Sequence, residues 1–261
     1  MRIGISTASL FLRRFNEDAL ALFREWNIPV TEVFLSSFSE YDPAFSTAML
    51  APRKGNVEVH SVHVINTQFE PQLYAVHPRV REDAFRLLGQ TMESARILGA
   101  AHYTFHGIAR LKRTYREDLY HVANETRKIA EFCAEYGVKL CYENVEWAFY
   151  NRPGIFAALK AECPELRGVL DIKQARISGY DYREYLADMA GSISHVHVSD
   201  FDGERNRLPG KGCFDFDELF ARLKDAGFDG PVLIENYAKD FEELSELRAS
   251  YEFLAEKAAK Y

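Results

Sequence analysis

Cysteine and long hydrophobic runs are both scarce in this sequence, and their scarcity narrows the class of protein. Only 4 cysteines occur among 261 residues, and no two of them have the C-x-x-C spacing of a zinc knuckle or a redox centre. No apolar stretch approaches the roughly 20 residues that cross a bilayer, and Arg13 and Arg14 follow the first apolar segment too early for a secretory signal. We therefore expect a cytoplasmic protein without a disulfide framework and without a membrane partner.

Positive charge is also in deficit. The chain has 32 Lys and Arg against 39 Asp and Glu, which gives a net charge of −7 at pH 7. Because a protein that binds the phosphate backbone usually carries a basic surface, we expect no nucleic-acid partner. The hydrophobic fraction of 47% and the charged fraction of 27% are ordinary for a soluble chain that buries a sizeable core, and they exclude a disordered tail or a collagen-like repeat.

The glycine-rich phosphate motifs G-x-G-x-x-G and G-x-x-x-x-G-K-[ST] are absent too, and no Gly-, Ser- or Pro-rich linker divides the chain. What the sequence contains is an alternation of short β-branched runs with longer segments of helical period. The predicted strands are Arg2–Thr7, Val30–Ser36, Val57–Ile65, Ala101–Gly107, Lys139–Val145, Gly168–Ala175, Ile193–Asp200 and Pro231–Asn236. Alternating strands and helices predict parallel pairing with right-handed crossovers. Since a doubly wound sheet lacks its usual phosphate signature here, we predict an α/β fold, a (β/α)8 TIM barrel formed as a single domain by residues 1–261.

Metal-capable side chains lie near the ends of the later strands. Glu143 is near the end of the fifth, Asp171 is in the sixth, His197 is near the end of the seventh and Glu235 is near the end of the eighth. The carboxyl ends of barrel strands meet at the face where substrates bind, and several buried carboxylates at one point need a cation or a network of partners. Three carboxylates and one imidazole suit one divalent ion (Mn²⁺, Mg²⁺, Co²⁺ or Zn²⁺), so we predict such a site. The alternative is a set of buried ion pairs.

Five ordered motifs carry a family resemblance. They are Tyr142-Glu143-Asn144, Leu170-Asp171, His195-Val196-His197-Val198-Ser199-Asp200, Asn206-Arg207-Leu208-Pro209-Gly210-Lys211-Gly212 and Leu233-Ile234-Glu235-Asn236. In this order and spacing they resemble the xylose isomerase-like barrel superfamily, in particular its sugar (phosphate) isomerase and epimerase branch. The resemblance runs from the first predicted strand to the last predicted helix.

The resemblance implies roles for particular residues. It implies that Glu143, Asp171, His197 and Glu235 bind one divalent ion, and that Glu143 and Glu235 move a proton on opposite faces of a bound sugar. It also implies that Arg207 contacts a sugar oxygen. The implied activity is a metal-dependent isomerisation or epimerisation of a sugar or sugar phosphate through an enediolate, as part of carbohydrate metabolism.

The chain departs from the family pattern at one position and offers further candidate contacts. Gln174, preceded by Lys173, stands where the family commonly has a histidine; a glutamine can bind a sugar hydroxyl but is a poor metal ligand. His63 and His106 end the third and fourth predicted strands, where they could contact substrate or a second ion. Trp147 follows Glu143 closely and could form an apolar wall against a sugar ring. Two long connections, residues 66–82 and 201–214, are predicted to be substrate loops.

Three other functions are compatible with parts of this pattern. A dehydratase of a keto-sugar or cyclic polyol, a lyase, would begin with the same proton abstraction. An abasic-site endonuclease of the same superfamily binds three zinc ions, but Gln174 and the charge of −7 oppose that function. A sugar-binding protein without activity would not need two glutamates beside a metal. The 19 Phe and 14 Tyr make a homo-oligomer reasonable.

Overall fold

Eight parallel strands close into a barrel in the computed structural model, which describes residues 1–110 and 118–261. The order around the barrel is β1-β10-β7-β6-β5-β4-β3-β2, so successive βα units lie side by side. The strands are β1 Arg2–Ser6, β2 Val30–Leu35, β3 Glu58–Val64, β4 His102–Phe105, β5 Lys139–Glu143, β6 Arg167–Asp171, β7 Ile193–Val198 and β10 Pro231–Ile234. The predicted (β/α)8 TIM barrel is confirmed.

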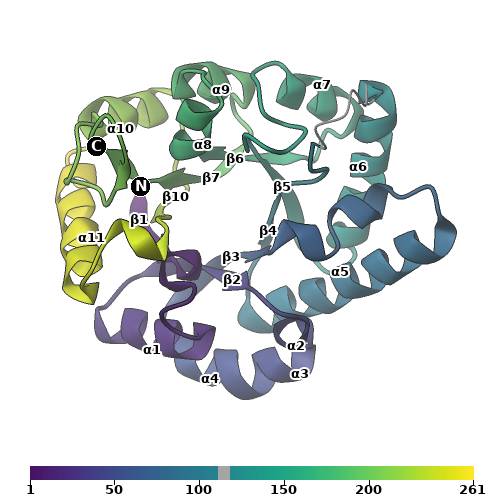
Figure 1. The fold of residues 1–261 in the computed structure, drawn as a ribbon, viewed down its shortest axis with the longest axis horizontal. Coiled ribbons are helices and arrows are strands. Elements are labelled where there is room, and N and C mark those ends of the chain that lie inside the picture. Colours follow the sequence, from purple (N-terminus) through teal and green to yellow (C-terminus); the bar gives the residue numbers. More distant parts are fainter. Residues whose placement is uncertain (111–117) are drawn as a thin grey trace.

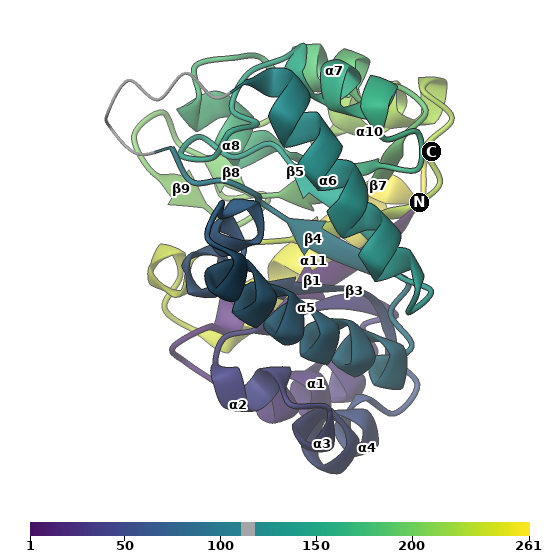
Figure 2. The same ribbon diagram turned by 90° about the vertical axis from the view of Figure 1, so that its right-hand side faces the viewer.

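Helices form an outer ring around the strands (Figure 1). Each longer helix packs one apolar stripe inward; in α5, for example, Leu88, Met92 and Ala95 are buried at the four- and three-residue spacing of one helix face. Figure 2 shows α5 and α6 on the outside of β3, β4 and β5. The helices are α1 Asn16–Glu25, α2 Phe38–Tyr41, α3 Pro43–Phe45, α4 Ala51–Lys54, α5 Pro78–Leu98, α6 Leu119–Ala134, α7 Ile155–Glu162, α8 Ile172–Ile177, α9 Tyr182–Asp188, α10 Phe216–Asp225 and α11 Leu244–Ala258. Short turns of other helix types lie at Thr7–Leu10, Ser46–Leu50, Asn66–Gln68, Pro71–Tyr74 and Ala238–Asp240.

The sixth strand ends earlier than the sequence predicts. The predicted strand Gly168–Ala175 is wrong beyond Asp171, where α8 begins at once. The Asp171 carboxylate accepts a hydrogen bond from the backbone N–H of Gln174 at 2.8 Å, which caps the helix and turns the chain. Lys173 and Gln174 therefore lie in a helical first turn at the carboxyl end of the barrel.

The interior of the barrel is polar where many barrels are packed with branched apolar residues. His195 and His197 both point inward and are fully buried, as the alternation along β7 predicts. The pairing of β2 with β3 skips His60, and the pairing of β6 with β7 skips Ser194. Because such bulges re-aim side chains, these two extra residues meet, with His60 Nε2 at 3.2 Å from Ser194 Oγ.

The connection after β7 is ordered by one carboxylate. It contains a small antiparallel hairpin of β8 Asp200–Phe201 and β9 Asn206–Arg207. Asp200 accepts hydrogen bonds from the backbone N–H groups of Gly210, Gly212 and Phe214 at 3.0, 3.0 and 2.9 Å. None of the helices in the described parts of the chain has the length and apolar character needed to cross a membrane.

Candidate active site

The four predicted metal ligands converge at the carboxyl end of the barrel. Their ligand atoms, from Glu143, Asp171, His197 and Glu235, all lie within 4.8 Å of one another. Nδ1 of His197 lies 2.9 Å from Glu143 Oε1 and 3.4 Å from Glu235 Oε2. Strands β5, β6 and β7 deliver three of these residues at or near their last positions, and Glu235 directly follows β10.

One carboxylate oxygen of Asp171 accepts a hydrogen bond, and the other accepts none from the described residues. Asn144 joins the ends of β5 and β6: its side-chain N–H donates to Asp171 O at 2.9 Å, and its Oδ1 accepts from Asp171 N at 2.8 Å. With Oδ1 taken by the Gln174 N–H, the buried Oδ2 has no hydrogen-bond partner among residues 1–110 and 118–261. The Lys173 ammonium lies 3.6 Å from Oδ2, beyond hydrogen-bond distance, so Oδ2 is still available as a ligand and the residues present fit the divalent ion that the sequence predicts.

Burial and neighbouring charges shift the pKa values of the three carboxyl groups among the predicted ligands. Burial raises the pKa of the Asp171 carboxyl to about 6, although Lys173 opposes the shift. Burial alone would raise the pKa of Glu143 and Glu235, but the neighbouring His197 overcomes it, so that the pKa of Glu143 lies well below its usual range and that of Glu235 falls to about 2. Both glutamates are thus ionised at neutral pH, as ligands and general bases must be.

Lys173 places a positive charge beside the four predicted metal ligands. Its ammonium is buried and lies 3.4 Å from Glu235 Oε2, 3.6 Å from Asp171 Oδ2 and 4.7 Å from the centre of the Tyr237 ring. Burial would lower the pKa of Lys173, but the two carboxylates raise it above its usual value. Lys173 is therefore a permanent cation beside two of the predicted metal ligands.

Glu32 on β2 belongs to the site but was not predicted from the sequence. It is fully buried and accepts hydrogen bonds from Ser61 Oγ at 2.8 Å and from Thr104 Oγ1. Its Oε1 lies 3.1 Å from His197 Nε2, and its Oε2 lies 3.2 Å from His195 Nε2. The available signal was a single carboxylate in the middle of a strand whose other residues are apolar or threonine.

Glu70 is a second buried carboxylate that the sequence did not reveal. It lies in the connection after β3 and accepts from Tyr103 Oη at 2.7 Å, from Asn66 Nδ2 at 2.8 Å and from the His106 backbone N–H at 3.0 Å. Nδ1 of His106 lies 3.3 Å from Glu70 Oε2, and its Nε2 lies 2.9 Å from His63 Nε2. Burial would lower the pKa of His106, but the neighbouring carboxylates raise it to about 10. No periodicity marks Glu70 in the sequence, since it lies in a loop.

A cavity of about 560 Å³ opens above these residues. Glu143 and Glu235 line it, and so do the predicted substrate contacts His63, His106, Trp147 and Gln174. Gln174 Oε1 accepts from the Glu146 backbone N–H at 3.2 Å, and the Trp147 ring lies 5.3 Å from the His106 ring. Phe11, Leu12, Phe34 and Ile65 add apolar side chains to its lining.

Arg207, unlike the other predicted substrate contacts, does not line this cavity. It lies in the β8–β9 hairpin, and its guanidinium pairs with Asp202 Oδ2 at 2.6 Å. Its contact with a sugar stays a prediction.

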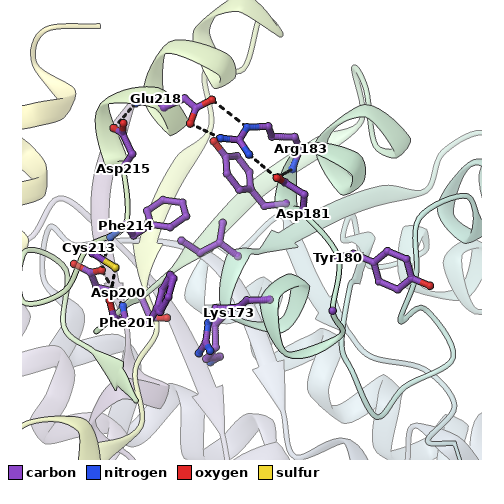
Figure 3. Close-up of a pocket in the computed structure, with 15 residues that line it drawn as sticks. Lys173, Tyr180, Asp181, Arg183, Asp200, Phe201, Cys213, Phe214, Asp215 and Glu218 are labelled. Carbon is purple, nitrogen blue, oxygen red and sulfur yellow. Dashed lines mark hydrogen bonds and ion pairs between the residues drawn. The ribbon is translucent and has the colours of Figure 1, made fainter. Parts of the chain in front are cut away.

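Lys173 also lines a second cavity, of about 550 Å³ (Figure 3). At its far end Arg183 pairs with Asp181 and Glu218, with Nε 3.0 Å from Glu218 Oε1. The described residues that line it include none of the predicted catalytic, metal or substrate residues. The chemistry that the sequence predicts therefore belongs to the first cavity.

Comparison with known proteins agrees with the fold and the motifs. A model of the family described as xylose isomerase-like TIM barrel matches residues 21–257. The uncharacterized protein MJ1311 of Methanocaldococcus jannaschii is 25% identical over 254 residues, which cover 90% of this chain and 84% of that protein.

Solved structures of the same shape include sugar epimerases. D-psicose 3-epimerase from Clostridium cellulolyticum H10, solved with D-tagatose, has a TM-score of 0.81 at 14% identity, over 100% of this chain and 99% of that one. The IOLI protein, solved with a zinc atom, has a TM-score of 0.71 at 15% identity, over 100% and 96%. At these identities the likeness shows the shared fold.

Proposed function

The chain belongs to the xylose isomerase-like TIM barrel family, and from this premise we propose that it is a divalent-metal-dependent isomerase or epimerase of a sugar or sugar phosphate. The observation that carries the proposal is the convergence of Glu143, Asp171, His197 and Glu235 within 4.8 Å, beside a cavity large enough for a small sugar. The structural similarity to sugar epimerases supports the same class of substrate.

These four residues would hold the ion. When bound, a divalent cation polarises a substrate carbonyl and stabilises the negative charge of an enediolate. Asp171 and His197 serve as ligands, and Asp171 Oδ2, which accepts no hydrogen bond from the described residues, supports that role.

Glu143 and Glu235 move the proton. Both side chains are buried from bulk solvent but line the cavity, and both are ionised at neutral pH. One glutamate takes a proton from a C–H beside the carbonyl; its return to the adjacent carbon gives an isomer, whereas delivery by the other glutamate to the opposite face gives an epimer. His63, His106, Trp147 and Gln174 line the same cavity and are the candidate sugar contacts.

The test is proton exchange with solvent. The Mn²⁺-loaded protein is incubated with panels of ketoses, aldoses and their phosphates in D₂O, and the sugars are analysed by NMR for deuterium and for new stereoisomers. Glu143→Gln and Glu235→Gln should each lower turnover by about 100-fold or more. Glu40→Gln, which removes another buried carboxylate that lies outside the ligand group, should stay within a few-fold of the wild type.

Two results would contradict the proposal. Turnover at the wild-type rate in either glutamine variant would remove the proton-transfer roles. A product that has lost one molecule of water, with no isomer formed, would identify a dehydratase instead.

A further inference from the structure

One histidine nitrogen next to the proposed metal ligands is buried without a partner. His63 is 6% exposed, and its Nδ1 has no hydrogen-bond partner in the part of the chain that the structure describes. This nitrogen lies 3.5 Å from Glu32 Oε1 and 3.6 Å from Glu235 Oε1. An unsatisfied buried nitrogen facing two carboxylate oxygens points to something that all three can bind.

The spacing of these atoms suits a cation. Ligands about 2.1 Å from a tetrahedral metal lie about 3.4 Å from one another, close to the two distances from His63 Nδ1. One imidazole and two carboxylates are ligands that Mn²⁺, Co²⁺ and Zn²⁺ accept. One ligand atom from each of the three residues lies within 4.8 Å of the other two.

The contacts behind His63 occupy its Nε2 and leave Nδ1 facing the two carboxylates. Glu70 accepts from Tyr103 and Asn66, which fixes it as an acceptor that faces His106 Nδ1 at 3.3 Å. On its other side the charged His106 lies with Nε2 3.1 Å from Glu143 Oε2 and 2.9 Å from His63 Nε2. The Nε2 side of His63 is therefore occupied by His106, and Nδ1 is the nitrogen that faces Glu32 and Glu235.

We propose that a second divalent cation binds to His63 Nδ1, Glu32 Oε1 and Glu235 Oε1, beside the four-ligand site. Glu235 joins the two sites, because its Oε2 faces His197 Nδ1 at 3.4 Å while its Oε1 faces His63. His63 and Glu235 line the cavity, so the cation has a route from solvent.

Occupation of the second site has a chemical consequence, which rests on the proposed function. A carboxylate held by two cations is a weaker base than one held by a single cation. Binding at His63 and Glu32 therefore slows the proton transfer assigned to Glu235 and leaves Glu143 as the stronger base. Excess metal then inhibits epimerisation more than isomerisation.

The experiment counts metal ions rather than turnover. Metal-free full-length protein is saturated with Mn²⁺ and desalted, and Mn per chain is measured by elemental analysis together with the electron paramagnetic resonance of coupled Mn²⁺ pairs. The wild type should hold two Mn²⁺ with a coupled signal. His63→Gln and Glu32→Gln should hold one, uncoupled, with at least a tenfold weaker second binding step. Glu40→Gln is the matched control, since this carboxylate is also buried but is bound to Ser36 and Asn16.

Each other outcome is decisive. A single Mn²⁺ in the wild type that is lost in Asp171→Asn would overturn the second site and leave the proposed function intact. No Mn²⁺ in the wild type would overturn both. Retention of two coupled ions in His63→Gln would overturn the second site alone, and this variant decides the matter if Glu32→Gln does not fold.

Discussion

Two histidines at the amino-terminal end of the barrel make the protein sensitive to acid. The rings of His60 and His102 stack with centroids 4.2 Å apart, and His102 Nδ1 lies 3.3 Å from the His60 carbonyl oxygen. Burial, together with the neighbouring His195, lowers the pKa of His60 to about 2 and that of His102 to about 4. We predict that His102→Gln, which removes one of these titrating groups, makes the fold less sensitive to low pH.

The sign and size follow from the pKa of His102. The unfolded chain binds a proton there near pH 6.5, whereas the folded protein does not until about pH 4, so the contribution of His102 to stability is intact above pH 6.5 and is lost as the pH falls toward 4. Each pH unit within that window costs about 1.4 kcal/mol. Between about pH 7.5 and about pH 5, the wild type should therefore lose about 2 kcal/mol more stability than His102→Gln.

Urea unfolding followed by circular dichroism at these two pH values measures the difference. His121→Gln serves as the control, because His121 is exposed on α6 and should leave the pH dependence of the free energy of unfolding unchanged. An equal loss of stability in the wild type and in His102→Gln, or a larger loss in the variant, would refute the argument that burial keeps His102 neutral.

Three further predictions concern other parts of the molecule. Gly4→Ala should destabilise the fold by about 3 kcal/mol in urea unfolding, since a Cβ there lies 2.1 Å from the Val30 carbonyl oxygen; a change below about 0.5 kcal/mol would contradict this. Lys173→Met should raise the affinity for Mn²⁺ about tenfold by calorimetry, because the ammonium repels a second cation; an equal or weaker affinity would show that Lys173 has another effect. Glu70→Gln should cost about 3 kcal/mol of stability, since it leaves the charged His106 without its carboxylate, and a thermal melt like that of the wild type would count against it.

The sequence was sufficient to predict the residues at the ends of strands. Strand alternation placed His195 and His197 on one inward face, and the structure confirms that both point into the barrel. Because the carboxyl ends of parallel strands meet at one rim, Glu143 and Glu235 could be expected near His197 from their positions alone. Their metal-binding and catalytic roles stay predictions.

Other parts of the site depend on events that leave little trace in the sequence. The four residues after Asp171, Ile-Lys-Gln-Ala, have no pattern that separates strand from helix, and the cap from Asp171 to the Gln174 N–H starts α8 there. The bulges at His60 and Ser194 change which side chains face inward, and they depend on the register of neighbouring strands. Glu70 reaches the site from a loop whose path no periodic pattern describes.

The polar interior of the barrel also constrains how this protein can change over evolutionary time. Glu32 is held by groups from several strands, among them Ser6, Ser61 and Thr104, and it adjoins His195 and His197. Replacement of one member leaves the others buried and unsatisfied, so the effects of substitutions on different strands are not additive. On the outer helix faces single substitutions can accumulate independently. In this interior a tolerated change requires several residues on different strands to be replaced together.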